Sequence, residues 1–129
     1  MRRLLILLPL LLVACGSKSD ADQIKDAYTS SAHAAAKGDA KGFCALYTDA
    51  SQKELAKALS AKDCETAFKQ NFHNAKAKDI KALQNVKVTK VVVKGDTAQV
   101  TTTLDPQNPE KAVKQDGQWK IQLPGATSG

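Results

Sequence analysis

The chain is short of arginine. Arg2 and Arg3 are its only arginines, and the other seventeen basic residues are lysines. Bidentate recognition of phosphate depends on the planar guanidinium group, so a phosphate site of that kind is not expected beyond position 3. The lysines also form no run of five or six like charges, the pattern typical of nucleic-acid-binding segments. We therefore expect a solvated, lysine-rich surface and no nucleic-acid partner.

Residues that carry common enzyme chemistry are equally scarce. His33 and His73 are the only histidines, and the sequence contains no glycine-rich phosphate loop. We expect His33 to face solvent and His73 to cap a helix end. The spacing of these histidines from the cysteines matches no standard zinc pattern. The sequence thus predicts no catalytic residue, no metal and no cofactor, and it favours a protein without enzymatic activity.

Long apolar runs are missing except at the start of the chain. Residues 4–11 are apolar, they follow Arg2 and Arg3, and a polar segment begins at Gly16. A membrane-spanning helix needs about 20 apolar residues. A basic start, a short apolar run and a small residue before the cut are typical of a secretory signal. We therefore predict that residues 1–14 form a signal peptide.

The end of this segment, Leu12-Val13-Ala14-Cys15, resembles the lipobox of bacterial lipoproteins. The resemblance implies cleavage after Ala14 and attachment of a diacylglycerol to the thiol of Cys15. Two or three acyl chains hold a protein on a membrane almost permanently. We expect a lipid-anchored protein that faces the extracytoplasmic side of the cell membrane or of the outer membrane. Loss of Arg2 and Arg3 with the signal lowers the formal net charge from +6 to +4.

The remainder divides into a stalk, a domain and a tail. Residues 15–21 are small and polar and predict a flexible, lipidated stalk. Residues 22–124 contain the periodic segments and are enough for one domain. Residues 125–129 predict a flexible tail.

Helical spacing dominates the first half of the domain. A first helix is expected over residues 22–37, with Gly38 as its stop signal. Asp39 is expected to cap a short second helix that continues through Tyr47. The residues at helical spacing on the expected inner faces of these two segments are Ile24, Ala27, Tyr28, Ser31, Ala35, Phe43, Cys44, Leu46 and Tyr47.

Two more helices are expected before residue 74. Ser51 and Glu54 form a capping-box pattern, so a third helix is predicted to begin near Ser51. Leu55 and Leu59 are its expected buried stripe. Asp63 is expected to cap a fourth helix over residues 64–73, whose buried stripe is Cys64, Phe68 and Phe72.

Beyond Leu83, β-branched residues predict a sheet. Residues 86–94 and 97–104 form the first expected hairpin, with Gly95-Asp96 as its turn. A loop is expected over residues 105–109. Asp116-Gly117 then predicts a tight hairpin between a strand at 111–115 and the last strand. The expected inward-facing residues are Ala98, Val100, Thr102, Leu104, Trp119, Ile121 and Leu123.

Helices followed by a four-stranded antiparallel sheet predict an α+β domain in which helices cover one curved sheet face. The region resembles small bacterial lipoproteins with a cone-shaped, nuclear-transport-factor-two-like fold, also called SnoaL-like. A cystatin-like or other helix-over-sheet layout is the alternative. The residues that carry the resemblance are Lys37-Gly38-Asp39, Phe43-Cys44-Ala45-Leu46, Asp63-Cys64-Glu65 and Asp116-Gly117-Gln118-Trp119-Lys120-Ile121.

Cys44 and Cys64 are the only thiols besides Cys15. An exported chain meets an oxidising compartment, so we expect a disulfide between them. A metal site or a redox pair fits less well, because redox cysteines are more often found as Cys-x-x-Cys.

The cone-shaped resemblance also implies a cavity. Its candidate lining residues are Tyr28, Tyr47, Phe72 and Trp119. Enzymes of this fold place an Asp or His base in such a cavity, and no base can be matched to a residue of this sequence. We expect a binding domain for a small ligand or an envelope protein. The alternatives are an isomerase- or dehydratase-like enzyme acting on a small apolar substrate, and a purely structural envelope protein.

Overall fold

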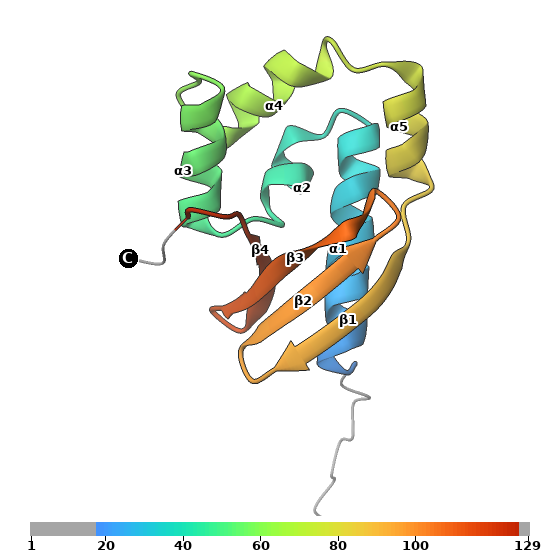
Figure 1. The fold of residues 1–129 in the computed structure, drawn as a ribbon. Coiled ribbons are helices and arrows are strands. Elements are labelled where there is room, and N and C mark those ends of the chain that lie inside the picture. Colours follow the sequence, from blue (N-terminus) through green and yellow to red (C-terminus); the bar gives the residue numbers. More distant parts are fainter. Residues whose placement is uncertain (1–17, 127–129) are drawn as a thin grey trace, which may run out of the picture.

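The helices precede the sheet along the chain. The computed structural model describes residues 18–126, so the expected signal peptide and the lipidation site Cys15 lie outside the described residues. Figure 1 shows a long first helix against a sheet, with the other helices grouped beyond one end of that sheet. The elements are α1 (Asp20–Ala36), α2 (Ala40–Cys44), α3 (Asp49–Ala58), α4 (Cys64–Phe72), α5 (Ala77–Gln84), β1 (Val88–Lys94), β2 (Thr97–Thr102), β3 (Asp105–Gln115) and β4 (Gln118–Gln122).

Helix α1 begins earlier than predicted. The side chain of Ser19 accepts a hydrogen bond from the Asp22 backbone N–H at 3.2 Å, and this N-cap starts the helix at Asp20. The last two residues of the predicted stalk therefore belong to the helix. Gly38 stops the helix as predicted, with φ at +77°.

The start of α3 also differs from the prediction. Thr48 is the N-cap, because its hydroxyl accepts from the Ser51 N–H at 3.1 Å. Ser51 lies inside the helix and is fully buried, and its hydroxyl accepts from the Leu123 N–H at 2.9 Å. The predicted capping box at Ser51 is therefore wrong. Leu59 follows the last helical residue and is 40% exposed, so it does not continue the buried stripe.

Three further helices depart from the sequence analysis. Helix α2 ends at Cys44 rather than at Tyr47. Helix α4 has the predicted Asp63 cap, but Ala67 is more deeply buried than Phe68 and Phe72. The sequence analysis missed α5, which has no side-chain N-cap to mark its start and whose apolar residues Ile80 and Leu83 are only partly buried.

The disulfide prediction is confirmed: Cys44 and Cys64 are bonded, and their Cα atoms lie 6.1 Å apart. The bond joins the end of α2 to the start of α4, with α3 between them in sequence. Within residues 18–126, no helix is long and apolar enough to cross a membrane.

The four strands form one antiparallel sheet in the order β1-β2-β3-β4. Its inner face packs on α1, and the core between them contains Ile24, Tyr28, Ala32, Leu46, Val86, Ala98, Val100, Ala112, Trp119 and Ile121. On the outer side of β4, the Ile121 N–H donates to the Leu46 carbonyl at 2.7 Å, and the Thr48 N–H donates to the Ile121 carbonyl at 3.1 Å. The segment before α3 thus covers this sheet edge.

The predicted loop at residues 105–109 is part of β3. Thr102 pairs with Asp105, so the β2–β3 connection is Thr103-Leu104, and Leu104 is 41% exposed instead of facing inward. The next pair on this side is Val100 with Glu110. Residues 106–109 therefore lie opposite the single residue Thr101 and form a bulge. Pro106 and Pro109 lack backbone N–H groups, which suits them to a segment outside the regular ladder.

Candidate functional site

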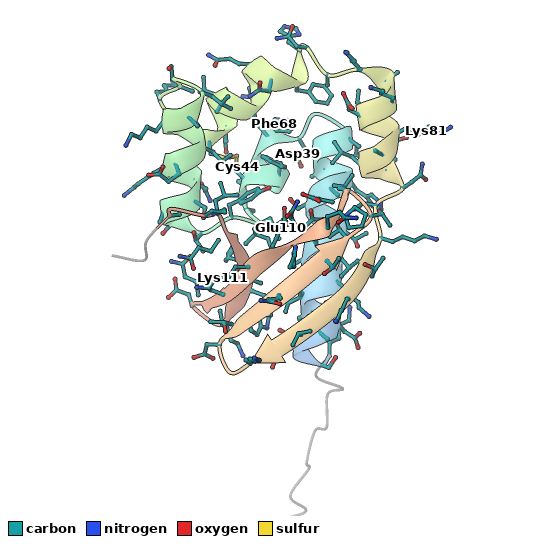
Figure 2. All side chains as sticks on the ribbon, viewed as in Figure 1. Asp39, Cys44, Phe68, Lys81, Glu110 and Lys111 are labelled. Atoms are coloured by element: carbon teal, nitrogen blue, oxygen red, sulfur yellow. A yellow bond between two sulfur atoms is a disulfide. The ribbon has the colours of Figure 1, made fainter. Side chains whose placement is uncertain are left out.

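A carboxylate lies on the inner face of the sheet. Glu110 is directly opposite Val100, and opposed residues of antiparallel strands point to the same side. Val100 is completely buried in the core, so Glu110 points toward the helical side as well. Figure 2 shows Glu110 between the sheet and the helices around α2. The site therefore combines a half-buried acid with an apolar sheet surface.

Two tyrosines lie near this acid, and a threonine contacts one of them. Burial raises the pKa of Glu110 above its ordinary value of 4.5; hydrogen bonding with Tyr28 acts against this rise, and the nearby charge of Asp105 adds to it. Burial also raises the pKa of Tyr28 to about 12, with contributions from Glu110 and an opposing hydrogen bond from Thr102. Burial, followed by the charges of Glu110 and Tyr28, raises the pKa of Tyr47. These four side chains form one polar cluster in an apolar setting.

The Glu110 carboxyl group is not fully satisfied within the protein. Its Oε2 atom is buried, and no hydrogen-bond partner reaches it from the described residues. A buried polar atom without a partner costs about 1–3 kcal/mol, more when it is charged. Such atoms are rare in native proteins and mark positions where a proton, a water molecule or a ligand completes the structure.

A pocket of about 500 Å³ adjoins Glu110. It forms because β3 extends past the end of β4: the last pair between these strands is Lys111 with Gln122. The chain then turns toward α3, where Ser51 holds the Leu123 N–H. The residues lining the pocket are Asp105, Asn108, Pro109, Glu110, Lys111, Ile121, Gln122, Leu123, Pro124, Gly125 and Ala126.

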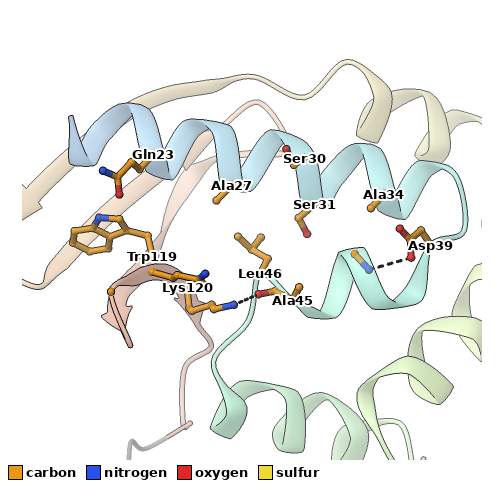
Figure 3. A pocket seen from close by; sticks show the side chains of 13 residues that line it. Gln23, Ala27, Ser30, Ser31, Ala34, Asp39, Ala45, Leu46, Trp119 and Lys120 are labelled. Carbon is orange, nitrogen blue, oxygen red and sulfur yellow. Dashed lines mark hydrogen bonds between the residues drawn. The ribbon is translucent and has the colours of Figure 1, made fainter. Parts of the chain in front are cut away.

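A second hollow of about 520 Å³ lies between α1, α2 and β4 (Figure 3). Several of its polar groups already have protein partners. The Trp119 Nε1–H donates to Asp20 at 3.0 Å, and the Ser31 hydroxyl donates to the Phe43 carbonyl at 3.1 Å. Lys120 donates to the Ala45 carbonyl. Because these groups are satisfied without a ligand, we take the Glu110 pocket as the better candidate site.

The structure does not gather all four predicted cavity residues. Tyr28 and Tyr47 both adjoin Glu110. Phe72 stands at the end of an aromatic row in which Tyr47, Phe43, Phe68 and Phe72 follow one another with ring centroids 5.2, 4.8 and 5.6 Å apart. Trp119 lines the hollow beside α1 instead.

The histidines lie outside this cluster. His33 is exposed in the last turn of α1, and His73 is the exposed C-cap of α4, as the sequence indicated. Across residues 18–126, no group of three or more His, Cys, Asp or Glu side chains is placed to hold a metal ion.

The sequence analysis missed Glu110. The two prolines suggested a loop and delayed the predicted strand to residue 111. Extending the strand by one residue would have revealed the site, because Glu110 and Ala112 lie two residues apart and strand side chains alternate. The available signal was a charged residue at a position that strand alternation assigns to the buried face of the sheet.

Comparisons of the chain with protein-family models, with curated proteins and with solved structures find no match.

Proposed function

We propose that this protein is a bacterial lipoprotein anchored through acylated Cys15, with an extracytoplasmic domain that binds a small ligand beside Glu110. The observation that carries the binding role is the half-buried Glu110 carboxyl group, which has an unpartnered oxygen and adjoins a pocket of about 500 Å³. Pockets of this size suit small molecules.

Two features of the chain support the proposed lipid anchor. Leu12 to Cys15 have the composition of a lipobox. The Cys44–Cys64 disulfide is typical of proteins that fold in an oxidising compartment. Together these features favour export followed by lipid attachment.

The early start of α1 supports an anchor close to the domain. Only four residue steps separate Cys15 from the N-cap Ser19, which corresponds to at most about 14 Å of extended chain. The start of α1 and the group formed by α3, α4 and α5 lie at opposite ends of the molecule (Figure 1). In the anchored protein, those three helices would then face away from the membrane.

Within the α+β class, we propose that the domain has the cone-shaped, nuclear-transport-factor-two-like fold. A long α1 across the inner face of an antiparallel sheet supports it, as does the position of the polar cluster between them. The cystatin-like alternative shares the first of these features.

Metabolic labelling tests the proposed lipid anchor, and native mass spectrometry separately tests the proposed binding of a small ligand. Radiolabelled palmitate should enter the wild-type chain and not Cys15→Ser, and the variant should leave the membrane fraction. If the wild-type chain is not labelled, the proposed lipid anchor is wrong. Native mass spectrometry of the full chain, released from detergent, should show a bound small molecule. A bound protein in its place would support the role of an envelope interaction protein.

A second candidate function is enzymatic. Glu110 has the raised pKa and the apolar surroundings of a general base, and Tyr28 is placed to stabilise its charge. Incubating the co-purified molecule with wild type and with Glu110→Gln separates the roles. Product formation by wild type alone would establish an enzyme, and an unchanged molecule would establish a binding protein.

A further inference from the structure

We infer that the pocket beside Glu110 selects an organic cation, a ligand that presents an ammonium group to Glu110 and Asp105. This inference rests on the proposed small-ligand function and adds the chemical class of the ligand. The two carboxylates both line the pocket. They are close enough for the charge of Asp105 to influence Glu110.

Register places these two carboxylates on the same face of the sheet. Asp105 is opposite Thr102, and Glu110 is opposite Val100. Thr102 and Val100 are both buried on the inner face, two residues apart on one strand. Asp105 therefore stands at the rim of the inner face and Glu110 further inside it, with the bulge of residues 106–109 between them.

No lysine neutralises this pair, although the chain is rich in lysine. Within residues 18–126 the ion pairs are Lys18–Asp26 and Lys114–Asp20, and neither involves the pocket. Lys111 lines the pocket but follows Glu110 directly in the strand, so its side chain leaves from the opposite face. Within residues 18–126, the two acids of the pocket wall thus form no ion pair with a protein cation.

The remaining contacts hold the carboxylates ready for a ligand. The Asn108 Nδ2 atom lies 3.2 Å from each Asp105 oxygen and orients that carboxylate. The Oε2 atom of Glu110 has no protein donor in the described part of the chain. A ligand ammonium would offset the repulsion between the two acids and supply charge-assisted hydrogen bonds, which are stronger than neutral ones. The apolar side of the ligand would contact Pro109, Ile121 and Leu123.

Three probes of nearly equal shape test the charge preference: benzylamine, benzyl alcohol and benzoate. Each is titrated at pH 7 into the full-length, detergent-solubilised protein, and binding is followed by NMR shifts of backbone amides. We expect benzylamine to bind at least about tenfold more tightly than either of the others, the factor that one charge-assisted hydrogen bond supplies.

Matched variants locate the interaction. Glu110→Gln should weaken benzylamine binding about tenfold or more, and Asp105→Asn should weaken it by a smaller factor. Glu54→Gln, an exposed α3 position, should leave it unchanged. Asp105→Asn gives the answer if Glu110→Gln fails to fold. Equal binding of benzylamine and benzyl alcohol, or a preference for benzoate, would overturn the inference while leaving small-ligand binding in place. Absence of binding by all three probes would also overturn it, and native mass spectrometry would then decide the proposed function on its own.

Discussion

The indole Nε1–H of Trp119 donates a 3.0 Å hydrogen bond to Asp20, a residue 99 positions earlier in the chain. The contact joins β4 to the first turn of α1. It involves the only tryptophan of the protein, a residue that is 5% exposed. This partly buried hydrogen bond therefore adds to the packing that holds the two ends of the folded region together, and its loss is measurable.

Asp20→Ala should lower the free energy of unfolding by about 1 kcal/mol, because it removes the indole hydrogen bond together with the weak, exposed ion pair between Asp20 and Lys114. For a domain of this size the melting temperature should fall by roughly 4 °C. Asp22→Ala is the control, since it also removes an acid from the first turn but leaves the indole bond intact. Tryptophan fluorescence should shift in the first variant alone. Equal effects of both variants would show that only the helix terminus matters.

Removing the disulfide should be costly under oxidising conditions. The bond closes a loop of 20 residues, for which chain entropy predicts about 3 kcal/mol of stabilisation. The double variant Cys44→Ala/Cys64→Ala should therefore melt roughly 10–20 °C below wild type. With reductant present, the two proteins should melt at similar temperatures. Equal melting without reductant would contradict the bond.

Gly38 is expected to resist substitution for two separate reasons. Its φ of +77° disfavours any side chain, and an added Cβ would lie 3.0 Å from Cε1 of Phe72. Gly38→Ala should cost about 1–2 kcal/mol from the backbone conformation alone, and more from the contact. Gly117 has the same φ with no atom near its Cβ position, so Gly117→Ala isolates the backbone cost. Calorimetric melting of both variants measures the difference, which should vanish if Phe72 does not pack on Gly38.

Glu110 should make the protein less stable as pH rises. A carboxyl group whose folded pKa is raised binds its proton more tightly in the folded state than in the unfolded state. The favourable contribution of Glu110 to the free energy of unfolding is therefore fully present below pH 4.5. It is lost as the pH rises through the higher pKa of the folded state. The charged or titratable groups around it are Asp105, Tyr28 and Tyr47.

The neutral variant Glu110→Gln removes this dependence. Its melting temperature relative to wild type should increase between pH 4 and pH 7, because only the wild type must ionise a buried acid. Melting curves at a series of pH values measure the difference, in which the other carboxylates cancel. A difference that does not change with pH would show that Glu110 is well solvated.

Much of the fold could be predicted from the sequence because its local signals agree with tertiary packing. The Asp39 and Asp63 caps, the stop at Gly38 and the turn at Asp116-Gly117 all have the expected positions. Each depends on one backbone or side-chain preference that acts within four residues. Such preferences do not require knowledge of distant contacts.

The sequence-based predictions were wrong where contacts between residues far apart in the chain determine the local structure. Ser51 has a good capping sequence, but its hydroxyl is buried because it holds the Leu123 backbone 72 positions away. The α5 segment has no cap of its own and is placed by packing on α1. Glu110 was hidden by the neighbouring prolines, and its burial follows from register with Val100 rather than from local sequence.

The bulge at residues 106–109 separates the register of β3 from the length of the segment between Asp105 and Glu110. The pairs Thr102–Asp105 and Val100–Glu110 hold β3 in register on both sides of it. The length of the intervening segment can therefore change without moving either acid to the other face. Doubling a flexible loop costs only about 0.6 kcal/mol. If the proposed ligand binds beside Glu110, insertions or deletions in this segment would change the pocket rim while Glu110 stays in place.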